Sequence, residues 1–267
     1  MTLIVSLRIP DGIVIAGDSL STTMQQLHIQ GEFEVECPEC SHKHTFGPVD
    51  VAPVRMPSTT FSYAQKVFPF LDDFGVGTFG RGLLAGKTMH FAIRELEEEI
   101  RSAQDPPDTS GVEEVADIIA MRAHELLQQD IDDLSKIPED RYVVRFQVVG
   151  YQDSEAETIA KNIGREINTE RWRGLGCTRS GQAKVVDAIW QLYQEHPKDE
   201  AAYAVFSLQD AIAYAEFLIG STASYQQFSR ALPTVGGHID IALLTPFDGF
   251  NWIQQKPLTA TLEAQNE

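Results

Sequence analysis

Basic residues are scarce in this chain of 267 residues: 21 lysines and arginines stand against 39 aspartates and glutamates, and the formal net charge is −18. A nucleic-acid-binding protein needs a basic surface for the phosphates. A protein that binds anionic lipid needs one for the headgroups. The charge balance therefore excludes nucleic acid and an anionic membrane surface from the partners that we expect.

Long apolar runs and cysteines are scarce as well. No run of about 18 apolar residues is present, so no segment is predicted to span a bilayer. The sequence begins Met-Thr-Leu-Ile-Val-Ser-Leu-Arg, which lacks the basic and long apolar regions of a signal peptide. Three cysteines are too few for a disulfide framework. We therefore expect a cytoplasmic protein, in a compartment where thiols stay reduced.

The remaining composition is that of a globular protein, with 43 % hydrophobic and 22 % charged residues. We expect one domain over residues 2–256. A polar segment at 23–60 interrupts the regular strand and helix patterns and is predicted to be an inserted loop. The tail at 257–267 is predicted to be disordered.

Helix patterns occur in two pairs, and strand patterns lie before, between and after them. The helices are expected at about 84–100, after a capping box Ser110–Glu113, at about 180–195, and after Ser207 with Asp210 at the N3 position. Segregated runs of this kind indicate the α+β class. Two sheets packed face to face, with a helix pair on each outer side, would cover every apolar face, so we expect a four-layer αββα sandwich.

Thr2 carries the strongest functional signal. Methionine before a small residue is normally removed, which would leave Thr2 with a free α-amine. The amine is a base with an ordinary pKa of about 7.7–8.0, so a threonine at the N-terminus is a self-contained pair of nucleophile and base. A nearby cation would lower the pKa of the amine, and a carboxylate would hold that cation in place.

Five short segments follow one another along the chain: Thr2-Leu-Ile-Val-Ser, Val14-Ile-Ala-Gly-Asp18, Lys66-Val-Phe, Val76-Gly-Thr-Phe-Gly80 and Val235-Gly-Gly-His-Ile-Asp-Ile-Ala-Leu-Leu-Thr245. In this order they resemble the proteasome β subunit and its bacterial HslV-type relatives. Those proteins are N-terminal-nucleophile (Ntn) hydrolases with an αββα sandwich. The resemblance covers nearly the whole chain apart from the 23–60 insertion and the tail.

The resemblance implies a role for each matching residue. Thr2 matches the nucleophile, Lys66 the lysine beside its amine, and Asp18 the carboxylate that holds this lysine. Gly80 matches the residue whose backbone N–H binds the oxyanion, with Thr78 as the alternative register. A donor at such a position stabilises the tetrahedral intermediate of acyl transfer.

Three positions depart from the family pattern. Cys177 stands where the family has a serine near the amine, with Thr178 or Ser180 as substitutes in the same strand. Leu232 and Val235 replace an aspartate and a serine of the polar network around the amine. Either catalysis runs on Thr2, Asp18 and Lys66 alone, or activity is weakened or lost.

The sequence therefore predicts a threonine-type peptidase or amidase that acts on peptides or unfolded proteins. By resemblance it would assemble into a homo-oligomeric ring and could work with an ATPase partner. The alternatives are a catalytically inactive scaffold of the same fold, and a zinc-dependent interaction module formed by residues 23–60.

The inserted segment contains a cysteine–histidine cluster. Cys37, Cys40, His42 and His44 place four zinc-type ligands within eight residues, which makes a candidate structural zinc site. The spacing differs from that of a zinc finger, whose two ligand pairs are separated by a dozen residues or more. A half-site completed by His28 or by another subunit, and a ribbon without metal, are the alternatives. No cofactor is required for the predicted catalysis.

Overall fold

The computed structural model describes residues 2–139, 141–196, 201–230 and 232–257, without the side chains of residues 23–35 and 44–58. The chain divides into two compact units: one joins the first 21 residues to the chain from Ser62 onwards, and the other is Thr22–Phe61. The second unit spans the predicted insertion. It consists of two long paired strands, β3 (Ser21–Glu36) and β4 (Lys43–Phe61), rather than irregular loop. The predicted tail lies outside the described residues from residue 258 onwards.

The larger unit contains two five-stranded sheets, in each of which adjacent strands are antiparallel. The first has the order β12 (Gly176–Gly181), β1 (Leu3–Ile9), β2 (Gly12–Asp18), β13 (Ile239–Thr245) and β14 (Gly249–Gln254). Every residue of β1 and β2 is buried, because apolar side chains alternate onto both faces of these strands. Both faces of this sheet are therefore covered.

The second sheet has the order β11 (Ile167–Arg173), β10 (Glu155–Gly164), β9 (Tyr142–Gln152), β6 (Phe74–Gly80) and β5 (Val67–Phe70). A short pair, β7 (Leu83–Leu84) and β8 (Lys87–Thr88), follows β6. Lys66 lies immediately before β5, and its carbonyl oxygen accepts a hydrogen bond of 2.8 Å from the N–H of Thr78 in β6.

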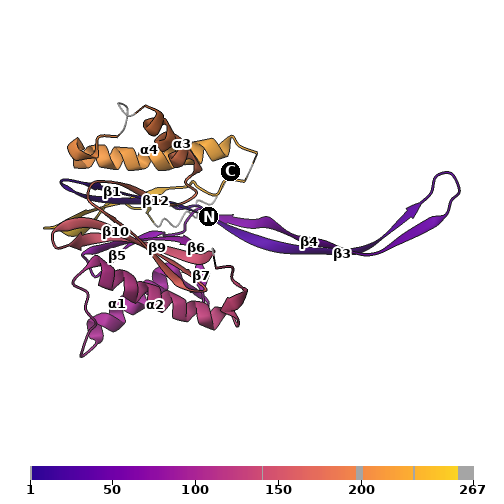
Figure 1. Cartoon of the computed structure of the whole chain (residues 1–267), viewed down its shortest axis with the longest axis horizontal. Helices are drawn as coiled ribbons and strands as arrows, with labels where there is room; N and C mark the ends of the chain where they lie inside the picture. Colours follow the sequence, from indigo (N-terminus) through magenta and orange to yellow (C-terminus); the bar gives the residue numbers. More distant parts are fainter. Residues whose placement is uncertain (1, 140, 197–200, 231, 258–267) are drawn as a thin grey trace, which may run out of the picture. The chain divides into compact units, whose positions relative to one another are not determined.

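The described residues contain four α-helices: α1 (Met89–Ser102), α2 (Val112–Asp130), α3 (Lys184–Glu195) and α4 (Leu208–Gln227). Two 3₁₀ turns lie at η1 (Leu134–Lys136) and η3 (Tyr203–Val205). Figure 1 shows α3 and α4 on one side of the sheets and α1 and α2 on the other. No helix in this part of the chain is long and apolar enough to cross a membrane.

Three apolar clusters account for this arrangement. One joins α1 and α2 to the second sheet, and its largest buried side chains include Phe68, Phe70 and Phe146. Another joins α3 and α4 to the first sheet through Leu3, Val5 and Leu218. The third lies between strands of the two sheets, and its buried members are Ile4, Ile13, Ile15, Val67, Val149, Ala242 and Leu244. Burial of apolar surface on both sides of each sheet stabilises the unit.

The sequence predicted the mixed α and β content correctly, and the capping box of Ser207 and Asp210 at the start of α4 is confirmed. The capping box at Ser110 was wrong. Gly111 is the N-cap of α2, and its lack of a side chain leaves no capping hydrogen bond there. The apolar stripe assigned to the first helix also began too early, because Leu84 lies in β7 and α1 begins after the N-cap Thr88.

Candidate active site

A buried ion pair lies where β2 ends and β5 begins. Lys66 Nζ is 3.0 Å from Asp18 Oδ1, and the two residues are 6 % and 1 % exposed. The Lys66 ammonium also donates to the carbonyl oxygen of Leu20. The structure thus brings together two of the residues that the sequence singled out, 48 positions apart.

The Asp18 carboxylate accepts three further hydrogen bonds, all from backbone N–H groups. They come from Leu3 at 2.9 Å, Gly236 at 3.1 Å and Leu20 at 3.2 Å. The carboxylate therefore ties β1, the end of β2 and the segment before β13 to one point. Three donors and an ammonium satisfy a buried carboxylate, which an apolar interior alone would not tolerate as an ion.

Burial acts on both members of this pair. Desolvation raises the pKa of Asp18, against the attraction of Lys66 and the hydrogen bond from Leu3. Desolvation lowers the pKa of Lys66, against the attraction of Asp18. Each charge is thus held in the interior by the other.

Thr2 precedes Leu3, whose N–H donates to Asp18, and Thr2 is 5 % exposed. Its neighbour Leu3 is anchored to Asp18 on one side and is paired with Gly181 of β12 on the other. The Thr2 carbonyl oxygen accepts a hydrogen bond of 2.8 Å from the N–H of Gln182. The start of β1 is therefore fixed from both sides.

Gly181 makes this close approach possible. A Cβ added there would lie 1.9 Å from the Thr2 carbonyl oxygen and 2.9 Å from Cδ2 of Phe79, and Gly181 has a φ of +102°. The beginning of β1, the end of β12 and the end of β6 thus meet at one place. Gly80 follows Phe79 with a φ of +105°, and a Cβ on it would lie 2.4 Å from the Val143 carbonyl oxygen.

We expect Gly181→Ala to destabilise the protein more than Gly174→Ala, although both glycines have a positive φ. Gly174 has a φ of +70° and open space where a Cβ would lie, so its substitution costs only the backbone strain. At Gly181 the overlap with Thr2 should add about 1–3 kcal/mol. Urea unfolding of both variants measures the difference, and equal midpoints would show that Thr2 is not held against Gly181.

The structure does not bring Cys177 to Thr2. Cys177 pairs with Leu7, whereas Gly181 pairs with Leu3 at the other end of the same ladder. The Cys177 side chain packs against the cluster formed with α3 and α4, and burial raises the pKa of its thiol to about 12. A thiol in such a place stays protonated and unreactive at neutral pH.

A buried polar network lies near Thr2 that the sequence analysis missed. Ser180, next to Gly181, donates to the Gln147 side chain at 2.7 Å. The Gln147 amide donates to Ser6 at 2.7 Å, and Ser6 lies 3.2 Å from the Thr158 hydroxyl. Arg8 donates to the same Thr158 hydroxyl. The signal was present in β1, where Ser6 and Arg8 share a face with the buried Ile4.

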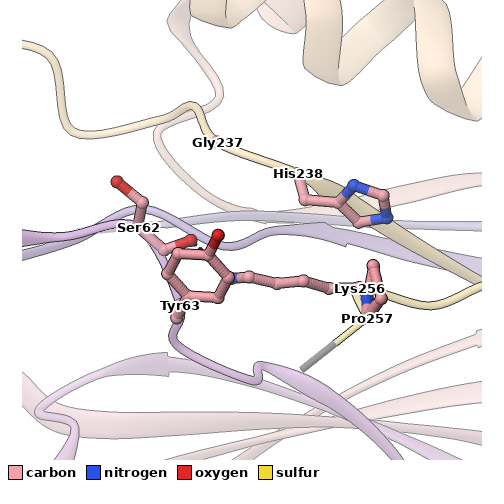
Figure 2. Close-up of a pocket in the computed structure, with 6 residues that line it drawn as sticks. All are labelled: Ser62, Tyr63, Gly237, His238, Lys256 and Pro257. Carbon is pink, nitrogen blue, oxygen red and sulfur yellow. Dashed lines mark hydrogen bonds between the residues drawn. The ribbon is translucent and has the colours of Figure 1, made fainter. Parts of the chain in front are cut away.

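A pocket of about 240 Å³ is lined by Ser62, Tyr63, Gly237, His238, Lys256 and Pro257 (Figure 2). The Ser62 carbonyl oxygen accepts from the hydroxyl of Ser19, the residue after Asp18. Lys256 Nζ lies 3.9 Å from the centroid of the Tyr63 ring. Desolvation lowers the pKa of Lys256, with Asp240 and Asp18 opposing the shift. The pocket thus presents a positive charge close to Asp18 and Lys66.

Leu232 and Val235 have different surroundings. Leu232 is 55 % exposed, and Val235 is buried in the apolar cluster of α3 and α4. Neither side chain has a polar group. From this segment, the backbone N–H of Gly236 donates the hydrogen bond to Asp18.

The cysteine–histidine cluster belongs to the smaller unit. Cys37 and Cys40 are free thiols in the loop between β3 and β4, and His42 is exposed in the same loop. The backbone groups of Glu39 and Cys40 hydrogen-bond to the Cys37 thiol and lower its pKa. The side chains of His44 and His28 lie outside the described residues. Within the described part of the chain, no three or more His, Cys, Asp or Glu residues are grouped to hold a metal ion.

The described residues thus form a mixed α/β fold with two five-stranded antiparallel sheets and four α-helices. Among solved structures, the chain is similar to Anbu (ancestral beta-subunit) from Yersinia bercovieri, with a TM-score of 0.54 and 12 % identity, over 95 % of this chain and 87 % of that one. It is also similar to a Gly-1 mutant of Anbu from Hyphomicrobium sp. strain MC1, with a TM-score of 0.56 and 13 % identity, over 98 % and 89 %. No family model and no curated protein matches the chain.

These comparisons correct the resemblance drawn from the sequence. The assignment to the proteasome β subunit and its HslV-type relatives was wrong, because the structural neighbours are Anbu proteins, which form a proteasome-related but distinct family. The short motifs around Thr2, Asp18 and Lys66 did not distinguish these related families. At 12–13 % identity the likeness is a likeness of fold.

Proposed function

We propose that the larger unit is a four-layer αββα sandwich of the Ntn-hydrolase type and that Thr2, after removal of Met1, is the nucleophile of a threonine-type peptidase or amidase. The observation that carries the proposal is the buried start of β1. Thr2 is 5 % exposed, and the next residue is bonded to the Asp18 carboxylate that holds Lys66. The three apolar clusters support the layer order.

In the proposed reaction, the Thr2 Oγ1 attacks the carbonyl carbon of a substrate amide. The α-amine takes the hydroxyl proton, directly or through a water molecule, and later gives it to the leaving amine. The Lys66 ammonium disfavours a second positive charge nearby and so keeps the amine neutral. Asp18 is a positioning residue, since its carboxylate holds Lys66 at 3.0 Å.

The tetrahedral intermediate needs a donor for its oxyanion. We assign this role to the backbone N–H of Gly80, because the end of β6 meets the start of β1 at Gly181. Collapse of the intermediate breaks the amide bond and leaves an ester on Thr2. Water then hydrolyses the ester and regenerates the hydroxyl.

Peptides or unfolded proteins are the proposed substrates. We also propose self-association into a homo-oligomer, with a ring and an ATPase partner as the finer expectations. The neighbours' name, ancestral beta-subunit, supports self-association. So do exposed apolar side chains on α3, on α4 and at the C-cap of α4, which include Leu192, Phe217, Tyr225 and Phe228.

The second candidate is a scaffold of the same fold without activity. Val235 favours it, because a buried apolar side chain stands where the predicted network around the amine has a hydroxyl. This candidate keeps the Asp18–Lys66 pair as a purely structural ion pair.

Mass spectrometry separates the two candidates. The accessible thiols are first blocked with iodoacetamide, and the chain is then treated with a peptide vinyl sulfone and digested. We expect an intact mass without Met1 and an adduct on the peptide that begins at Thr2. Retention of Met1, or an adduct confined to other peptides, would leave the scaffold as the function.

A further inference from the structure

The loop between β3 and β4 has the backbone of a tight metal-binding turn. The N–H of Cys37 donates to the His42 carbonyl oxygen at 2.9 Å, and the N–H of Ser41 donates to the Cys37 carbonyl oxygen at 2.9 Å. Ser41 has a φ of 55°, in the left-handed region that lets the chain turn back sharply. These bonds return the chain within six residues and place Cys37 and Cys40 on one turn.

The same turn directs hydrogen-bond donors at a sulfur atom. Backbone groups of Glu39 and Cys40, and the Cys40 thiol, hydrogen-bond to Cys37. The hydrogen bond between the two thiols places the sulfur atoms of Cys37 and Cys40 next to each other. Neither cysteine is used by the proposed catalysis, and both are free thiols. The arrangement therefore offers two soft ligands of the kind that zinc prefers.

One copy of the chain does not complete a site with the residues that the structure describes. A structural zinc ion takes four ligands in a tetrahedron, and a Cys-x-x-Cys turn supplies two of them. The described residues hold no cluster of three or more ligand-type side chains. Two further thiolates with the same spacing are available from the same turn of a second copy.

We propose that Cys37 and Cys40 form half of a tetrahedral zinc site, which the same two cysteines of a second copy of this chain complete. Binding turns four thiols into four thiolates and releases their protons to solvent, so the reaction needs no oxidant or reductant. The turn would thereby join two hairpins tip to tip. This proposal is independent of the proposed hydrolysis, because it uses neither Thr2 nor its surroundings.

Zinc content of the full chain tests the proposal. The protein is stripped with a chelator, loaded with zinc chloride, desalted and analysed for metal. Because a tetrahedral site takes four ligands and each chain gives two, we expect one zinc ion for every two chains. Cys40→Ser should abolish binding. His42→Ala should retain it, and Cys177→Ser is the matched control for loss of a thiol elsewhere.

Alkylation gives a second readout on the same samples. Zinc should protect Cys37 and Cys40 from iodoacetamide, whereas Cys177 should stay unlabelled with or without zinc because its thiol pKa is raised to about 12. One zinc ion per chain, lost in His42→Ala, would overturn the shared site in favour of a site within one chain. No zinc retained above the level of Cys40→Ser would overturn zinc binding altogether.

Discussion

Thr2→Ala is expected to reduce the hydrolysis of a fluorogenic peptide amide by about 10³-fold or more, because it removes the nucleophilic hydroxyl and leaves only the contribution of substrate binding and the oxyanion donor. Thr2 is nearly buried, and alanine fits within the space of threonine, so the fold should survive. The rate constant under conditions of low substrate concentration reports the loss directly.

Thr2→Ser is the matched control for this loss. Serine keeps the hydroxyl and the α-amine and removes only a methyl group, so we expect it to retain much of the activity. Circular dichroism and the urea midpoint of both variants show whether the fold is intact. If Thr2→Ala cleaves the peptide as fast as Thr2→Ser, the hydroxyl takes no part in the reaction and the proposed function fails.

Asp18→Ala is expected to lower the free energy of unfolding by about 3–5 kcal/mol, because it leaves the Lys66 ammonium buried without its partner. The substitution also removes the acceptor for the N–H groups of Leu3 and Gly236. Unpaired buried donors add to the loss. Urea unfolding of Asp18→Ala measures the change.

A double-mutant cycle isolates the pair itself. Lys66→Met alone should also destabilise, whereas Asp18→Ala with Lys66→Met should cost clearly less than the sum of the two. The pair of Arg165 and Glu139 is the control. Its atoms lie 2.8 Å apart, but the side chains are 43 % and 82 % exposed. Glu139→Ala should therefore change stability by at most about 1 kcal/mol. A similar small effect at Asp18 would show that the buried pair is not a structural anchor.

Much of the site's framework was predictable from local pattern. The strand that ends at Asp18 and the strand that starts after Lys66 are both marked by apolar runs bounded by turns. The family resemblance implied that the Asp18 carboxylate holds the Lys66 cation, and the structure places the two groups at 3.0 Å. Segregated runs of helix and strand also sufficed for the mixed fold.

The position of β12 was not predictable in the same way. A ladder shifted by a few residues exchanges one polar residue for another, and the sequence alone did not fix the register that pairs Leu3 with Gly181 and Leu7 with Cys177. The sequence therefore suggested Cys177 as a residue near Thr2, whereas Ser180 and Gly181 are the residues of β12 that pair with the start of β1. The close contact of Gly181 with Thr2 depends on packing between distant segments, which no local pattern records.

The family resemblance was more specific than the short motifs could support. Segments such as Val14–Asp18 indicate a strand that ends in a carboxylate. This pattern suits any protein of the fold in which a buried lysine needs a partner of opposite charge. They carry little that separates related families. The polar composition of residues 23–60 likewise predicted a loop, whereas β3 and β4 are paired strands there.

The length of the β3–β4 hairpin sets a physical scale for what lies at its end. At about 3.3 Å per residue, a strand such as β3 with 16 residues extends roughly 50 Å. Two-stranded ribbons are only marginally stable on their own in water. The proposed zinc site would restrain such a ribbon at its far end. Two ribbons joined there end to end would span on the order of 100 Å.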